Sequence, residues 1–247
     1  MLELIHMTAL VVHIAIGSVA LIIFWLPIIE KKGSAFHKRS GQWFVWGMTA
    51  VSLSGILMSS LVFIDPLAIR DPQGLMTLAQ ANQAAEVGRS SSAFLFMLSF
   101  LVLCTTRQSS LALVARANRD VLKTPLHLFC ICMLVVSAFY VGYVGLQRTS
   151  MLYEIFSVLS IVSALGMLRY IYKRDLKKSE WIIEHLTNIV ASGIAAYTAF
   201  FVFGGQSFLN HLVPGDYQIL FWIMPGVIGA TISRTFAVKY RKQYRVA

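Results

Sequence analysis

Three histidines near the starts of predicted membrane helices could share a metal ion on one side of the membrane. Neutral imidazole is a common protein ligand for transition metals and for haem iron. Cys130 lies three residues after His127, on the same face of a helix, so its thiolate could join that site. The predicted cofactor-binding residues, which with Cys130 are also the predicted metal ligands, are His37, His127 and His185.

Lys38 and Arg39 follow His37 directly and favour a second interpretation of the same end of the molecule. A helix N-terminus with basic side chains binds phosphate groups, whether free or in a lipid headgroup. Such an anion or lipid-headgroup site needs no metal. A histidine at a membrane interface also commonly caps a loop or bonds a headgroup, and no pair of these histidines has a metal spacing such as HxxxH.

His6, His13 and Glu154 form a second group, predicted at the outer side. His6 and His13 are seven residues apart and so lie on one helix face. A charged side chain inside the bilayer costs about 3 kcal/mol on insertion scales, so His13 should face the bundle interior. With Glu154 it could form a proton relay, an outer ligand site or a purely structural hydrogen-bonded pair.

The composition predicts the elements that must position these side chains. Hydrophobic residues make up 57% of the 247 positions and charged residues only 13%, which is typical of a multi-pass membrane protein. The apolar stretches are long and continuous, so helices are expected rather than a barrel. We therefore predict an all-α, polytopic membrane helix bundle of about seven transmembrane helices in a single domain, residues 1–247. The predicted spans lie near residues 4–29, 42–64, 91–106, 125–146, 151–172, 181–203 and 217–236.

The basic residues predict the orientation of the bundle. All but three of the 21 lysines and arginines fall in segments 31–39, 107–123, 169–178 and 234–245, which alternate as seven spans would require. The positive-inside rule then places the N-terminus outside and the C-terminus in the cytoplasm. The net charge of +10 is explained by these loops. We therefore expect anionic lipids at the cytoplasmic face as partners, and no nucleic acid.

Two connecting segments could form helices of their own. Segment 65–90 begins with turn residues and continues as LMTLAQANQAAEVG, a weakly amphipathic stretch that could be a surface helix. Segment 108–123 fits either an interfacial helix or an extension of the third span. The sequence does not separate these alternatives.

Two stretches carry resemblances to known families. The segment KGSAFHKRSGQWFVWGM, with its H-[KR]-x-x-G turn, and the segments EHLTNIVASGIAAYTAFFVF and WIMPGVIGA resemble an uncharacterised family of bacterial multi-pass membrane proteins, a domain of unknown function. That resemblance implies a bacterial inner-membrane protein of about seven spans. The local HKRSG also resembles the HKSxG turn of bacterial cytochrome b561, which implies b-type haem held by membrane histidines.

Two functional hypotheses follow. The first is a haem- or transition-metal-binding redox protein with its histidine site near the cytoplasmic face, hence a candidate membrane oxidoreductase, with a quinone or another small molecule as a candidate ligand. The alternative is a cofactor-free, proton-coupled transporter or small-molecule sensor that uses His13 and Glu154. A homo-oligomer or a scaffold subunit is compatible with either. The sequence contains no phosphate loop, dinucleotide fingerprint or HExxH motif.

Overall fold

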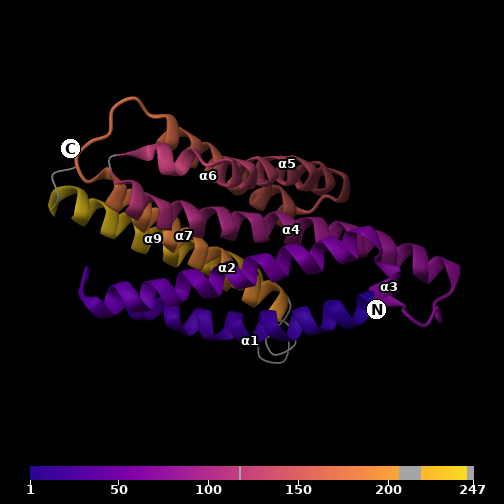
Figure 1. The fold of residues 1–247 in the computed structure, drawn as a ribbon. Helices are drawn as coiled ribbons and strands as arrows, with labels where there is room; N and C mark the ends of the chain where they lie inside the picture. Colours follow the sequence, from indigo (N-terminus) through magenta and orange to yellow (C-terminus); the bar gives the residue numbers. More distant parts are fainter. Residues whose placement is uncertain (117, 206–217, 244–247) are drawn as a thin grey trace. The chain divides into compact units, whose positions relative to one another are not determined.

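The computed structural model describes residues 1–116, 118–205 and 218–243, and within these ranges all regular structure is helical (Figure 1). The prediction of an all-α fold is therefore confirmed. In chain order the elements are α1 (Leu2–Ile29), α2 (Ala35–Ile64), α3 (Leu67–Arg70), α4 (Leu78–Ala115), the 3-10 helix η1 (Arg119–Lys123), α5 (Pro125–Arg148), α6 (Met151–Tyr172), α7 (Glu180–Ala199), the π-helical turn η2 (Phe200–Gly204) and α9 (Gln218–Gln243).

Six helical segments of the described chain are long and apolar enough to cross a membrane. They contain the first six predicted spans, so the chain is a helical membrane protein. Most of the predicted seventh span lies in α9, which is not among the six, and residue 217 lies outside the described residues. The six segments are Leu2–Ile29, Ala35–Ile64, Leu78–Ala115, Pro125–Arg148, Met151–Tyr172 and Glu180–Gly204.

The chain forms two compact units, and three of the long helices contribute to both. The first unit comprises Met1–Cys104 and Leu128–Gly166, and the second comprises Thr105–His127 and Met167–Ala247. Helices α4, α5 and α6 therefore each begin in one unit and end in the other. The expectation of a single domain stays a prediction.

In the first unit, α1 and α2 lie side by side as a hairpin (Figure 1). Phe24 and Phe44 are buried between them, with ring centroids 5.3 Å apart. The short connection is held by polar contacts at both helix ends. Lys32 donates to the carbonyls of Pro27 and Ile28, each at 2.6 Å, where α1 has no further backbone donors. Ser34 caps the N-terminus of α2.

Segment 65–90 contains helical structure, but not as a separate surface helix. After the single turn α3, helix α4 begins at Leu78 and continues without a break through the predicted third span. No proline interrupts it, and Ser90, Ser91 and Ser99 donate to carbonyls of the preceding turn. Gly88 allows close packing on the α3 turn, because a Cβ there would lie 2.9 Å from Cβ of Pro66.

The C-terminal end of α4 decides between the two expectations for segment 108–123. The helix runs to Ala115, so the first part of this segment extends the third span. Arg116 then adopts a left-handed conformation, with φ of 47°, and Asn118 caps the 3-10 helix η1. Arg119 anchors this turn by donating to the carbonyl of Tyr170 at 3.0 Å.

Candidate functional site

His37, His127 and His185 lie near the starts of their helices as predicted, and a metal ion shared by the three stays a prediction. His37 belongs to the first unit, whereas His127 and His185 belong to the second. Nδ1 of His37 donates to the carbonyl of Pro27 at 3.0 Å, and Cys130 is buried in the first unit. Within the described ranges, no group of three or more histidine, cysteine, aspartate or glutamate residues is placed to hold a metal ion.

His127 instead begins a chain of hydrogen bonds that crosses the second unit. Its side chain is completely buried, as is that of Gln108, and Nε2 of His127 lies 2.7 Å from Oε1 of Gln108. The amide nitrogen of Gln108 donates to Oε1 of Glu184 at 2.7 Å. Asn188 donates to the same carboxylate oxygen at 3.0 Å. We call these four residues the polar cluster.

The directions of the hydrogen bonds in the polar cluster determine that Nε2 of the His127 ring carries a hydrogen. Because the Gln108 nitrogen faces a carboxylate, which accepts when ionised, its oxygen must face His127. A carbonyl oxygen only accepts, so Nε2 of His127 carries the hydrogen. When the ring is neutral, Nδ1 of His127 is then the lone-pair nitrogen. It is buried and has no hydrogen-bond partner among the described residues.

His185 makes a separate contact with the neighbouring residue of α4. The hydroxyl of Ser109 donates to the backbone carbonyl of His185 at 3.0 Å, so its oxygen accepts from Nδ1 of His185 at 2.8 Å. Ser109 is completely buried. The contact ties α7 to α4 next to the polar cluster. It thereby fixes the register in which Glu184 meets Gln108.

Helical spacing explains why these side chains meet. On α4, Gln108 and Ser109 lie on a completely buried face that also includes Ala112. Ala112 is four residues after Gln108 and three residues after Ser109, which places all three on one side of the helix. On α7, Glu184 and Asn188 are four residues apart, and Asn188 also donates to the carbonyl of Glu184 at 2.9 Å. Asn188 is 8% exposed, so it is buried in the second unit.

Glu180 and Glu184 lie one turn apart on α7 but differ in environment. Glu180 forms an ion pair with Lys173 at 2.6 Å and accepts from the backbone of Lys177, which stabilises the start of the helix. Glu184 has amide donors only, and it forms no ion pair with any residue that the structure describes. Of these two glutamates, Glu184 is the one that has no ion-pair partner among the described residues.

Several buried polar atoms of the second unit have no hydrogen-bond partner among the described residues. The phenol of Tyr170 is one of them, in a side chain that is 5% exposed. It lies within the electrostatic influence of Glu184, Glu180 and Arg119. Buried polar groups are normally paired, so these atoms suit water or a polar ligand. The others are Thr106 Oγ1, Arg107 Nε, Thr124 Oγ1 and His127 Nδ1.

The predicted outer residues are only partly brought together. His6 and His13 are both half-buried on one face of α1, which confirms their common face. Nδ1 of His13 lies 2.9 Å from Oγ of Ser54, which itself donates to carbonyls of its own helix, so the ring donates. Glu154 packs against Gly145 instead. No hydrogen bond joins His13 to Glu154 in the described part of the molecule.

Thr198 is buried, whereas Tyr140 and Tyr143 are 44% and 61% exposed. These tyrosines fit the aromatic belt of a membrane interface better than a polar interior. The sequence interpretation missed Gln108 and Tyr170. The signal for Gln108 was the polar run 105–110 inside an otherwise apolar helix.

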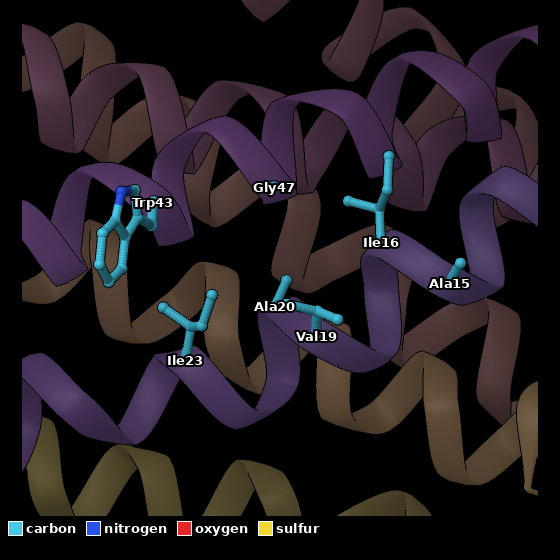
Figure 2. A pocket seen from close by; sticks show the side chains of 7 residues that line it. All are labelled: Ala15, Ile16, Val19, Ala20, Ile23, Trp43 and Gly47. Atoms are coloured by element: carbon cyan, nitrogen blue, oxygen red, sulfur yellow. The ribbon is translucent and has the colours of Figure 1, made fainter.

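An apolar groove lies between α1 and α2 in the first unit. Its volume is about 300 Å³, and Figure 2 shows the side chains that line it from both helices. The guanidinium of Arg39 lies 5.0 Å from the ring centroid of Trp43. The lining residues are Ala15, Ile16, Val19, Ala20, Ile23, Trp43 and Gly47.

No family model matches the chain, and comparisons with curated proteins and with solved structures found no match. The resemblances to the uncharacterised family and to cytochrome b561 therefore stay predictions. The function is inferred below from the residues of this chain alone.

Proposed function

We propose that this protein is a cofactor-free, proton-coupled transporter or sensor of a small polar solute, and that the polar cluster is its working site. The observation that carries the proposal is the unbroken hydrogen-bonded chain from His127 through Gln108 to Glu184. Ionisable side chains inside membrane helices are costly, and they commonly mark proton or substrate pathways. The proposal assigns to this cluster the role that the sequence suggested for His13 and Glu154.

Glu184 is the proposed proton-exchanging group. As a carboxylate it accepts from two amides at one oxygen, and no cation compensates its charge among the described residues. Protonation would turn part of this acceptor into a donor. The Gln108 amide would then be favoured in the opposite orientation, with its oxygen toward Glu184 and its nitrogen toward His127.

Gln108 is the proposed coupling element, because an amide has a donor at one end and an acceptor at the other. When its nitrogen faces His127, Nε2 of that ring must accept, and the hydrogen moves to Nδ1. The unpartnered Nδ1 would thus change from acceptor to donor. A polar solute bound near Nδ1 and the Tyr170 phenol would respond to the protonation of Glu184.

The experiment is proton flux into liposomes that contain the purified protein, followed with an internal pH-sensitive dye under an imposed potassium diffusion potential. We expect Glu184→Gln to reduce the flux by about tenfold or more, because it removes the exchanging carboxyl but keeps an amide in its place. Glu180→Gln is the matched control, one turn away, and should retain the flux. Equal flux in wild type and Glu184→Gln would refute the proposal.

A haem- or transition-metal-binding redox protein remains the second candidate, and one observation favours it. Metal-bound histidines usually donate their other ring hydrogen to an oxygen acceptor, and Gln108 accepts from Nε2 of His127 in this way. Nδ1 would be the ligating atom. The sequence gives His37, His185 and Cys130 as the other candidate ligands of b-type haem or a metal.

An ultraviolet-visible spectrum and elemental analysis of the purified protein separate the two candidates. A Soret band or a stoichiometric metal that is lost in the His37→Ala, His127→Ala and His185→Ala triple variant would favour the redox protein, and quinone reduction would be tested next. A folded, colourless and metal-free protein with proton flux would favour the cofactor-free proposal.

We also propose that α9 forms a seventh span, with the N-terminus outside and the C-terminus in the cytoplasm of a bacterial inner membrane. The alternating basic segments support this orientation. Helix α9 has 26 residues and ends with Arg241 and Lys242 in its last turn. Both its length and its basic end suit a helix that emerges on the cytoplasmic side.

A further inference from the structure

We propose that the groove between α1 and α2 binds one acyl chain of an anionic phospholipid, whose phosphate is held by Arg39. The groove is separate from the polar cluster and is assigned no part in proton exchange. The apolar wall of the groove suits the acyl chain of such a lipid, and Arg39 at the end of the groove suits its phosphate. The following observations carry the proposal.

The wall of the groove is made only of apolar side chains and one glycine. At the lining residue Gly47, α2 approaches α1 closely, since a Cβ there would lie 3.2 Å from Cβ of Ala20. Val19 is 55% exposed although it lines the groove. A volume of about 300 Å³ is at the small end of ligand pockets, which suits part of one hydrocarbon chain better than a bulky ring system.

Arg39 lies one helical turn before Trp43 on α2, at the end of the groove nearest the connection between the two helices. Its guanidinium is exposed over the Trp43 ring at 5.0 Å and forms no ion pair with a described residue. A stacked guanidinium is oriented and can bind a phosphate through two parallel hydrogen bonds. Tryptophan is enriched at the depth of lipid headgroups, which places this contact at the interface.

The charges around the groove end favour an anionic lipid over a zwitterionic one. Lys31 and Lys38 are exposed beside Arg39, and Glu30 is the acidic residue of this connection. Basic side chains near a membrane surface attract anionic headgroups over zwitterionic ones. Because the apolar groove continues from the arginine into the membrane, the same phosphate chemistry points to a phospholipid rather than to free phosphate.

Quenching of tryptophan fluorescence by brominated lipids tests the proposal on the full chain. We would keep Trp43 as the single tryptophan, replace the other four by phenylalanine, and compare dibrominated phosphatidylglycerol with dibrominated phosphatidylcholine. Phosphatidylglycerol should quench Trp43 at about fivefold lower mole fraction, which corresponds to about 1 kcal/mol. Arg39→Gln should remove this preference.

Two matched controls distinguish a site from general surface charge. A chain that keeps only Trp46, which is 62% exposed and three residues further along α2, should show no preference between the lipids. Lys38→Gln removes the same charge from the adjacent position, about 100° away around the helix, and should leave most of the preference. Equal losses in Lys38→Gln and Arg39→Gln would overturn the proposal.

Inorganic phosphate distinguishes the two sources of the anion. Millimolar phosphate should not remove the preference for phosphatidylglycerol, and if it does, the site binds free anions and the lipid proposal is wrong. If the single-tryptophan chains do not fold, native mass spectrometry of the otherwise unchanged protein replaces the fluorescence. Phosphatidylglycerol should then remain bound to the wild type and be lost from Arg39→Gln, and equal retention by both would overturn the proposal.

Discussion

Gln108 is completely buried, and its amide group forms hydrogen bonds to two ionisable side chains. Its amide nitrogen satisfies Glu184 while its oxygen satisfies His127. An apolar residue at this position would leave both partners without that bond, and an unpaired buried polar group costs about 1–3 kcal/mol. The identity of this one side chain therefore decides whether the polar cluster is continuous.

A double-mutant cycle measures the bond between Gln108 and His127. We expect Gln108→Leu and His127→Leu each to lower the stability of the protein in mixed detergent micelles. The double variant should lose less than the sum, with a coupling energy of about 0.5 to 2 kcal/mol. Gln108→Leu combined with Ser163→Ala should be additive, because Ser163 bonds only to its own helix. Additive losses in the first cycle would contradict the hydrogen bond.

At the scale of elements, the α5–α6 hairpin depends on close backbone approach. A Cβ at Gly145 would lie 3.1 Å from Cβ of Tyr153 and 3.2 Å from the backbone nitrogen of Glu154. Backbone atoms cannot move aside as a flexible side chain can. In the same hairpin, Ser157 donates to the carbonyl of Ala138 at 2.7 Å, so small and polar residues connect the two helices.

Gly145→Ala should destabilise the protein by about 1–3 kcal/mol, since the added methyl group forces the two helices apart. Gly166→Ala is the matched control in α6, where a Cβ would meet nothing within 4 Å. That change should be neutral or stabilising by up to about 1 kcal/mol, because alanine favours the helix. Unfolding midpoints in mixed micelles would compare the two, and a neutral Gly145→Ala would show that the hairpin is looser than described.

At the scale of the whole molecule, the proposed topology can be tested with cysteines placed at exposed positions. The native Cys104, Cys130 and Cys132 would first be replaced by alanine. In intact cells, a membrane-impermeant maleimide should label Gln73→Cys but not Lys31→Cys or Lys242→Cys. Labelling of Lys242→Cys from outside would mean that α9 does not cross the membrane.

The sequence alone determined the helical class, six of the helices and the positions of the histidines at helix starts. These features depend on local quantities: apolar length, proline and turn residues, and caps such as Ser34, whose hydroxyl accepts from the backbone of His37 at 3.1 Å. The common face of His6 and His13 also followed from helical periodicity. Each of these is set by residues close together in the chain.

The tertiary structure decided the partners of the polar side chains. His127 pairs with Gln108, and His13 pairs with Ser54 and not with Glu154. The reason is that these partners come from different helices, and their meeting depends on which helix faces pack and in what register. Periodicity gives the face of one helix, but it does not say which other helix lies against that face.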